Sequence, residues 1–293
     1  MKFEVQHRTT YRYGEPVTLG HNEVHLTPRD FRRQRCLSSR VIVMPEPAVT
    51  RSRIDYFGNP ATFFTLEEEH RELSITAISD VEILPGSLPD PAGTPPWESV
   101  RAALVRPIDA DHLAASQFTF DSPSLTRHDR LGEYAATSFT PGRPILAAAL
   151  DLTDRVYRDF KYDTKATCVS TPTLEVFENR RGVCQDFAHL QIACLRSLGL
   201  AARYVSGYLL TDPRPGQPRL VGADASHAWL SVYCGAADWI DLDPTNNQIP
   251  TTRHVTVAWG RDYSDVCPIN GVVLGGGHHA MSVAVDVVSA GIE

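Results

Sequence analysis

The chain has 293 residues, with 35 acidic and 28 basic side chains and a formal net charge of -7. Hydrophobic residues make up 42% of it and charged residues 22%, which is typical of a soluble globular protein and excludes the disordered and membrane-embedded classes. The negative charge argues against nucleic acid as a partner, because nucleic-acid-binding domains are more often basic. No basic run predicts a membrane-binding patch either.

The size and the cysteine pattern bound the organisation further. At 32.4 kDa the chain exceeds one typical domain, so two domains are expected. Its N-terminus lacks the apolar core of a signal peptide, and no apolar stretch is long enough to cross a bilayer. The six cysteines are scattered and form no Cys-x-x-Cys pair, which predicts free thiols rather than a disulfide framework or a zinc knuckle. We therefore expect a cytoplasmic protein.

Residues 1–85 predict an N-terminal antiparallel β-sandwich domain. Short runs of strand-like composition alternate there with turn residues such as Gly14-Glu15-Pro16 and Gly58-Asn59-Pro60. The predicted strands are Phe3–His7, Thr9–Tyr13, Glu23–Thr27, Ser38–Met44, Arg51–Tyr56, Ala61–Leu66 and Leu73–Leu84.

A proline-rich stretch marks the predicted domain boundary. Residues 85–96 hold five prolines and two glycines, which neither a helix nor a strand can accommodate. We assign residues 86–140 to a linker and irregular or helical segment, with a short helix at Trp97–Val105. Residues 141–293 form the second predicted domain.

The second domain begins with helical patterns and continues with strands. Apolar residues spaced three and four apart predict helices at Ile145–Phe160 and from Cys184 to Leu198, with a shorter helix at Thr173–Asn179. Strands follow at Ala201–Thr211, Ser226–Tyr233 and Trp239–Asp243, the last two as a hairpin. The segment Asp212–Gly216 is expected to be a surface loop. Later β runs lie at Val255–Trp259 and Met281–Val288, with Gly275-Gly276-Gly277 between them.

Cys184 is the first candidate for chemistry. Gly182 precedes it, Gly199 ends the helix that it opens, and the first turn of a helix favours an anion. Such a position favours the reactive thiolate. A cysteine alone, however, is as readily a small buried hydrophobe, so the interpretation depends on partner groups.

His227 and Asp243 are the partners that a cysteine nucleophile needs as base and orienting group. If the positions of opposite residues in the hairpin sum to an even number, the two side chains share one face and can touch. A shift of one residue would put them on opposite faces. Asp241 has the same parity as Asp243 and is the weaker candidate.

The segments Gly182-Val183-Cys184, His227-Ala228-Trp229 and Asp243-Pro244-Thr245, in this order, resemble the core signature of the transglutaminase-like superfamily. The resemblance implies an α+β chain whose residues 141–293 form a catalytic domain with a papain-like cysteine-protease fold. It makes Cys184 the nucleophile, His227 the general base and Asp243 the orienting acid. The segments at His7–Tyr13 and Asp55–Asn59 resemble the N-terminal β region of a bacterial subgroup.

The surroundings of the site carry weaker expectations. An oxyanion hole would use the backbone N–H of Cys184 and one further donor, for which Gln185 and Tyr162 are conceivable. Trp229 and Trp239 are expected to pack beside the site.

Three other groups have bland interpretations. Asp186 is expected to interact with the helix dipole, and His189 to be structural or solvent-facing. His278 and His279 fit a loop better than a metal site, because no carboxylate or thiol stands at ligand spacing.

We therefore expect a thiol-dependent acyl-transfer enzyme that acts on amide bonds of peptides or proteins, without a cofactor or a metal. Water as second substrate would make it a cysteine protease or amidase, which we slightly prefer, and an amine would make it a transglutaminase. The main alternative is a non-catalytic binding or scaffold module that retains the fold. A zinc protein that uses Cys184, His227 and a carboxylate is a third possibility.

Overall fold

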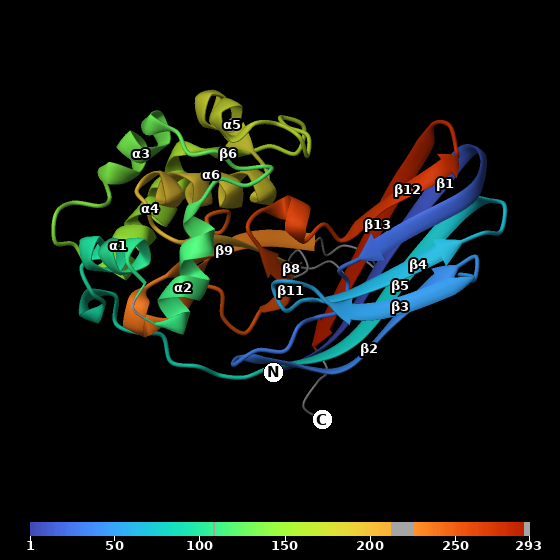
Figure 1. Ribbon diagram of the computed structural model, residues 1–293, viewed down its shortest axis with the longest axis horizontal. Coiled ribbons are helices and arrows are strands. Elements are labelled where there is room, and N and C mark those ends of the chain that lie inside the picture. Colours follow the sequence, from blue (N-terminus) through green and yellow to red (C-terminus); the bar gives the residue numbers. More distant parts are fainter. Residues whose placement is uncertain (108, 212–225, 290–293) are drawn as a thin grey trace, which may run out of the picture.

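The computed structural model describes residues 1–107, 109–211 and 226–289, so the predicted loop at 212–216 lies outside the described residues. It has two parts that lie side by side, an antiparallel β part and a part in which helices surround a second sheet (Figure 1). This arrangement confirms the predicted α+β fold class. No helix in the described ranges is long and apolar enough to cross a membrane.

The β part is organised around one long strand, β1. Its first half pairs with β5 on one side and with β13 on the other, and its second half pairs with β4 and β12. The outer strands β2 and β3 pair with β5 and β4. The bounds are β1 Lys2–Val24, β2 Gln34–Met44, β3 Val49–Ile54, β4 Pro60–Leu66, β5 His70–Ile83, β12 Ile269–Gly275 and β13 His279–Ser289.

These strands fold over into two layers at shared corners. The corner of β1 at Gly14–Pro16 is hydrogen-bonded to the corner between β12 and β13, where Gly275, Gly276 and Gly277 all have positive φ. Such backbone conformations suit glycine because it has no Cβ. The two layers enclose a buried cluster of Val24, Leu26, Phe64, Leu66, Leu73, Ile75 and Ala77.

Two sequence-based expectations for this part need correction. The strands predicted at Phe3–His7 and Thr9–Tyr13 belong to one strand that continues to Val24, because Gly14-Glu15-Pro16 bends the chain and shifts its register with β5 without ending the strand. Residues 269–289, which we had assigned to the catalytic domain, complete the sandwich through their pairing with β1. Local composition identifies a strand but not the distant strand with which it pairs.

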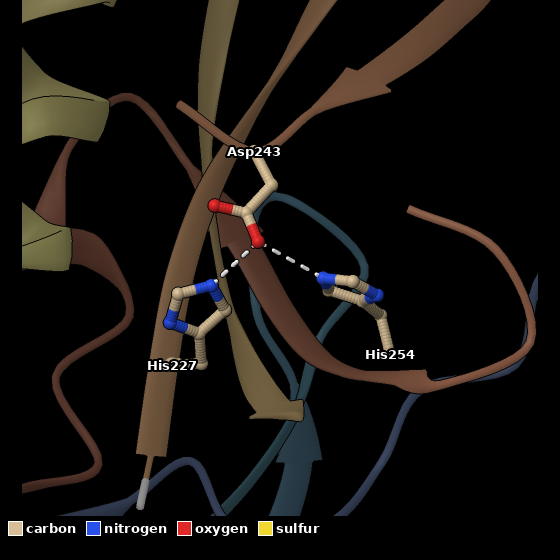
Figure 2. A group of neighbouring side chains, drawn as sticks. All are labelled: His227, Asp243 and His254. Atoms are coloured by element: carbon tan, nitrogen blue, oxygen red, sulfur yellow. Dashed lines mark hydrogen bonds and ion pairs between the residues drawn. The ribbon is translucent and has the colours of Figure 1, made fainter. Parts of the chain in front are cut away.

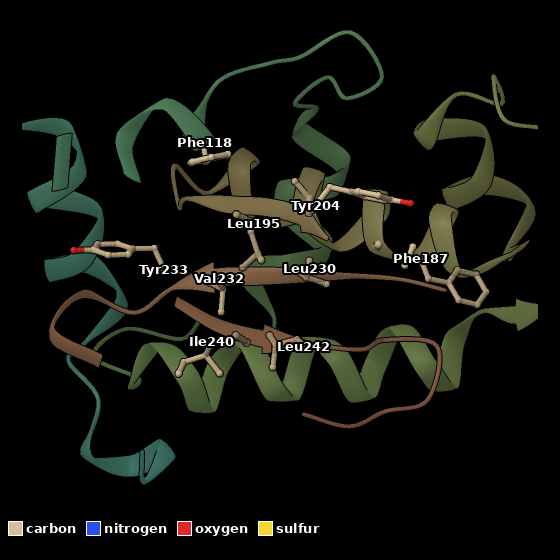
Figure 3. Close-up of a cluster of buried hydrophobic side chains, with 14 of the residues drawn as sticks. Phe118, Phe187, Leu195, Tyr204, Leu230, Val232, Tyr233, Ile240 and Leu242 are labelled. Carbon is tan, nitrogen blue, oxygen red and sulfur yellow. The ribbon is translucent and has the colours of Figure 1, made fainter. Parts of the chain in front are cut away.

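The second part contains a four-stranded antiparallel sheet in the order β10-β9-β8-β11. Helix α6 packs on β9 and β8, and Figure 3 shows part of the core around this sheet, to which β10 adds Ile240 and Leu242. The strand bounds are β8 Ala202–Leu209, β9 Ser226–Tyr233, β10 Trp239–Leu242 and β11 His254–Gly260, and a small parallel pair is formed by β6 Lys161–Tyr162 and β7 Arg181–Gly182.

Helices cover this sheet and confirm the predicted periodicities. The helix expected at Trp97–Val105 is present, and the segment 86–140 contributes Val100, Leu104 and Phe118 to the main core, so it is more than a linker. The bounds are α1 Trp97–Val105, α2 Ala110–Ser116, α3 Asp129–Ala136, α4 Ile145–Asp159, α5 Thr173–Asn179 and α6 Cys184–Ser197.

Helix α6 is the buried axis of the second part. As its sequence predicts, Gly199 follows it with a φ of 78°, and the Leu200 N–H returns to the Leu195 carbonyl. Near this end the buried Arg196 donates to the carbonyl oxygens of Ala202 and Arg261, among others. The end of α6 is thereby fixed to β8 and to the segment after β11.

The two parts meet along β11, the edge strand of the second sheet. The Gln34 amide donates to the Thr256 carbonyl at 2.7 Å and accepts from the Thr256 N–H at 2.8 Å. The Asn59 amide makes the same pair of bonds to Trp259, at 2.9 and 3.0 Å. Two side-chain amides of the sandwich thus satisfy backbone groups that an open sheet edge would expose.

Candidate active site

Cys184 is the first residue of α6, as the sequence predicts. The Asp186 carboxylate, three residues after the N-cap Val183, accepts the Val183 N–H at 2.8 Å and the Thr167 hydroxyl at 2.6 Å. A Cβ at position 182 would lie only 2.6 Å from this carboxylate, which explains the glycine there. Asp186 therefore closes the helix start and anchors the preceding loop, beyond its expected interaction with the dipole.

The hairpin has the register on which the triad hypothesis depends. Trp239 pairs with Tyr233 and Leu242 with Leu230, so the positions of opposite residues sum to an even number. His227 and Asp243 consequently lie on one face, and the Nε2 of His227 is 2.8 Å from the Oδ2 of Asp243 (Figure 2).

Asp243 is fully buried and is surrounded by hydrogen-bond donors. Its Oδ1 accepts the backbone N–H groups of Thr245 and Asn246, and its Oδ2 accepts the Asn246 amide at 2.7 Å. The Nε2 of His254 lies 3.1 Å from the same Oδ2. Burial alone would raise the pKa of this carboxyl, but the hydrogen bonds from His227 and His254 outweigh it, and the pKa falls well below its usual range.

His227 connects the carboxylate to the thiol. Burial lowers the pKa of its ring, but the hydrogen bonds to Asp243 and Cys184 outweigh burial and raise the pKa to about 10. Because Nε2 is bonded to Asp243, Nδ1 is the ring nitrogen left for Cys184. The structure therefore brings His227 and Asp243 into contact and places Cys184 near enough to His227 to raise its pKa.

Asp241 and Trp239 lie away from this group. The Asp241 carboxylate accepts the Ser231 hydroxyl. Trp239 pairs with Tyr233 at the closed end of the hairpin, opposite the end that carries His227, so its expected place beside the site is wrong. Trp229 does lie beside the site: it is buried, and its ring centroid is 6.0 Å from that of His227.

The remaining candidates have structural contacts. His189 is buried and accepts the Tyr263 N–H through Nε2 at 3.1 Å. The side chain of His279 lies against Tyr11 and Tyr13 of the sandwich. The Gln185 amide donates to the Val169 carbonyl, whereas the pKa of Tyr162 is raised by burial and by the nearby Cys184. Of the two conceivable oxyanion donors, Tyr162 is the one whose side chain is not held by the preceding loop.

His254 and Asn246 are site residues that sequence reasoning missed. The pattern shows His254 only as the start of a strand, and the contact with Asp243 depends on how the chain crosses between the two edges of the sheet. Together, His227, Asp243 and His254 place three ligand-type atoms within 4.8 Å of one another, and such a group could hold a metal ion.

A second thiol lies on the loop before α5. Cys168 is exposed, and its Sγ lies 3.4 Å from the Ser170 hydroxyl and 3.5 Å from the Thr171 hydroxyl. These hydrogen bonds lower the pKa of the Cys168 thiol to about 7. Any chemical test of Cys184 must therefore allow for a second reactive thiol.

Comparisons with known proteins agree with this geometry. Residues 3–82 match the bacterial transglutaminase-like N-terminal region, and residues 133–244 match the transglutaminase-like superfamily. The uncharacterized protein Rv2569c of Mycobacterium tuberculosis is 43% identical over 297 residues, which cover 98% of this chain and 92% of that protein. The uncharacterized protein ML0607 of Mycobacterium leprae is 35% identical and covers 98% of both chains.

Among solved structures, a candidate cysteine protease from Cytophaga hutchinsonii has the same fold. Its TM-score is 0.77 at 22% sequence identity, over 100% of this chain and 92% of that chain.

Proposed function

Because this chain belongs to the transglutaminase-like superfamily, we propose that it is a thiol-dependent enzyme that transfers acyl groups from amide bonds of peptides or proteins. The observation that carries the proposal is the position of His227, whose Nε2 lies 2.8 Å from the Asp243 carboxylate and whose pKa is raised by Asp243 and also by the nearby Cys184. A base that contacts both its nucleophile and its orienting group is what covalent cysteine catalysis requires.

The first half-reaction forms a thioester. The Cys184 sulfur attacks the amide carbonyl, and the carbon–nitrogen bond breaks as His227 gives its proton to the leaving amine. Asp243 holds the His227 ring in place and stabilises its charged form. The backbone N–H of Cys184, at a helix start, and the Tyr162 hydroxyl would donate to the oxyanion.

The second half-reaction releases the acyl group. A water molecule gives a proton to His227 and attacks the thioester, so the products are a carboxylic acid and the regenerated thiol. An amine in place of water gives a new amide. We favour hydrolysis, because water is always present.

Alkylation with iodoacetamide tests the nucleophile. In a Cys168→Ser background, Cys184 should react faster than the other four cysteines at mildly acidic pH, and His227→Ala should remove this advantage. Intact-protein and peptide mass spectrometry measure both rates. Equal labelling of all cysteines, or no effect of His227→Ala, would contradict the proposal.

The reaction type needs a substrate screen. Ammonia release from glutaminyl peptides, with and without an added amine, is compared with peptide cleavage, and Cys184→Ala serves as the control. Turnover that survives in Cys184→Ala would count against a thiol mechanism.

Two further points remain part of this proposal. The alternative is a non-catalytic binding or scaffold module, but such a module has no chemical need for Cys184, His227 and Asp243 close together. A cytoplasmic location agrees with the free state of the six cysteines. Cell fractionation tests it.

A further inference from the structure

His254 lies on the far side of Asp243 from the thiol. Asp243 comes from the segment that follows β10, His227 from β9 and His254 from the first position of β11, the opposite edge of the sheet. Figure 2 shows the Asp243 carboxylate between the two imidazoles. Their Nε2 atoms approach the same oxygen, at 2.8 and 3.1 Å.

The glycine at position 207 makes this approach possible. Gly207 on β8 pairs with His227 on one side and with Thr256 on the other. A Cβ at this position would lie 2.5 Å from the Trp229 ring and 2.1 Å from the Val255 carbonyl oxygen. The Trp229 ring instead occupies this space and meets the His254 ring edge-on, at a centroid distance of 5.2 Å. Packing therefore fixes the His254 ring as well as its hydrogen bond.

The imidazoles of His227 and His254 differ in the surroundings of Nδ1. The second nitrogen of His227 is the one available to Cys184. The Nδ1 of His254 is buried and has no hydrogen-bond partner among the described residues. A proton on Nε2 of His254 satisfies Asp243, whereas a second proton on Nδ1 would have no acceptor. His254 is thus suited to act as a neutral donor and cannot pass a proton to the thiol.

We propose that His254 is a positioning residue that holds the Asp243 carboxylate in the orientation from which it directs His227. The inference rests on the proposed function, because it gives His254 a role in the same site. Without this donor, Oδ2 keeps His227 and the Asn246 amide, and the buried carboxylate loses a hydrogen bond to its charge.

Loss of the His254 hydrogen bond should change the pH at which Asp243 takes up a proton. The titratable side chains that hydrogen-bond to Asp243 are His227 from β9 and His254 from β11, and the segment after β10 adds the Thr245 and Asn246 backbone N–H groups and the Asn246 amide. Removing the His254 donor raises the pKa of the Asp243 carboxyl. Asp243 then takes up a proton at a higher pH than in the parent, and His227 loses its partner there.

The experiment compares His254→Phe, which keeps an aromatic ring against Trp229, with His254→Gln, which restores an N–H donor. The matched control is His25→Phe, which removes a similarly buried histidine beside Asp55 in the sandwich. All variants carry Cys168→Ser. The readouts are the rate of Cys184 alkylation across pH 4–9 and the thermal unfolding temperature.

We expect His254→Phe to slow alkylation at neutral pH about ten- to hundredfold, because a less firmly held Asp243 carboxylate stabilises the charged His227 less. His254→Gln should recover most of the rate, and His25→Phe should match the parent. The proposal is overturned if a folded His254→Phe keeps the parental profile, or if both His254 variants lose rate only in proportion to their loss of folded protein. It is also overturned if the purified protein carries a stoichiometric metal that His254→Phe removes.

A second measurement separates this proposal from the proposed function. In a Cys184→Ala background, which is unable to react, the imidazole N–H proton of His227 is followed by NMR. The His254→Phe change should broaden or shift that resonance. On acidification the resonance should disappear at a higher pH than in the parent. This measurement does not require a known substrate. An unchanged resonance would overturn the role of His254 and leave the nucleophile unaffected.

Discussion

Two regions of the four-stranded sheet carry similar side chains that have different interaction partners. At one end Asp243 lies between His227 and His254, and the first of these also reaches Cys184. Toward the other end Asp241 accepts the Ser231 hydroxyl and lies near the Arg203 guanidinium rather than near an imidazole. Two carboxylates two residues apart, Asp241 within β10 and Asp243 directly after it, thus have different partners.

The second end is held by stacked rings. The Arg203 guanidinium lies between Trp239 and Trp259, 4.3 and 3.8 Å from the ring centroids, and Arg29 covers Trp259 from the sandwich at 3.1 Å. Such cation–π contacts fasten the two parts of the molecule together. The comparison shows that two carboxylates of one sheet have different partners, since Asp243 meets two imidazoles whereas Asp241 meets a hydroxyl beside the stacked arginine.

The sharpest way to test this difference is to neutralise each carboxylate in turn. Asp243→Asn should lower the turnover of any substrate found about 10⁴-fold and should also slow alkylation of Cys184, because an amide cannot hold His227 in its charged form and required tautomer. Asp241→Asn, the matched control, should stay within about threefold of the parent. Alkylation rates and turnover of any substrate found measure both, and similar losses in the two variants would refute the distinction.

The pH dependence of stability should distinguish His227 from the buried His7 and His189. Burial lowers the pKa of His7 and of His189 from 6.5 to about 4, so the unfolded chain binds their protons first as pH falls. The contribution of His7 and His189 to the free energy of unfolding is full above pH 6.5. It is lost as the pH falls from 6.5 to 4, at a rate on the order of 1 kcal/mol per pH unit for each histidine.

The contribution of His227 to stability has the opposite pH dependence. Because the pKa of His227 is raised to about 10, its contribution to stability is full below pH 6.5 and is lost as pH rises through 10. Urea unfolding at pH 4–10 measures both limbs. His7→Gln should flatten the acid limb only, and a change on the alkaline limb would contradict the assignment.

A methyl group at the glycine beneath the reactive end should disturb both histidines. Gly207→Ala places a Cβ against the Trp229 ring and the Val255 carbonyl, and we expect a loss of about 1–3 kcal/mol in the free energy of unfolding. The rate at Cys184 should fall with it. Ser206→Ala, one residue before it on the same strand, is the control, and equal stability of the two variants would show that the sheet relaxes without cost.

The smallest effect is expected at the stacked end. Arg203→Met removes the charge between the two tryptophans but keeps much of the side-chain volume, so the free energy of unfolding should fall by about 1 kcal/mol. The rate at Cys184 should not change. Arg203→Lys, which keeps the charge, is the comparison variant, and a lower rate in either would place this end within the site.

Much of the second part could be predicted from the sequence, because its signals are local. The helix at Trp97–Val105, the start of α6 at Cys184 and the strand at Ser226–Tyr233 agree with the structure to the residue. The parity of the hairpin could be stated only as a condition, since turn geometry decides it.

The features that the sequence does not predict share one physical cause, because each of them depends on contacts with residues far away in the sequence. Nothing near His254 shows that the chain after β10 brings it back to Asp243, and nothing near Met281 shows that its strand pairs with Tyr11. The oxyanion donor was left open for the same reason, because Gln185 and Tyr162 are distinguished only by contacts with other segments.

The pairing of β13 with β1 has a consequence for synthesis. Because Phe3 pairs with Ser289, β1 is synthesised long before β13, and this edge of β1 stays unpaired while the segments between them emerge. Helix α6 and the hairpin are complete before that edge is closed. A nascent chain therefore contains Cys184 and His227 while this edge of β1 is still open to pairing with other chains.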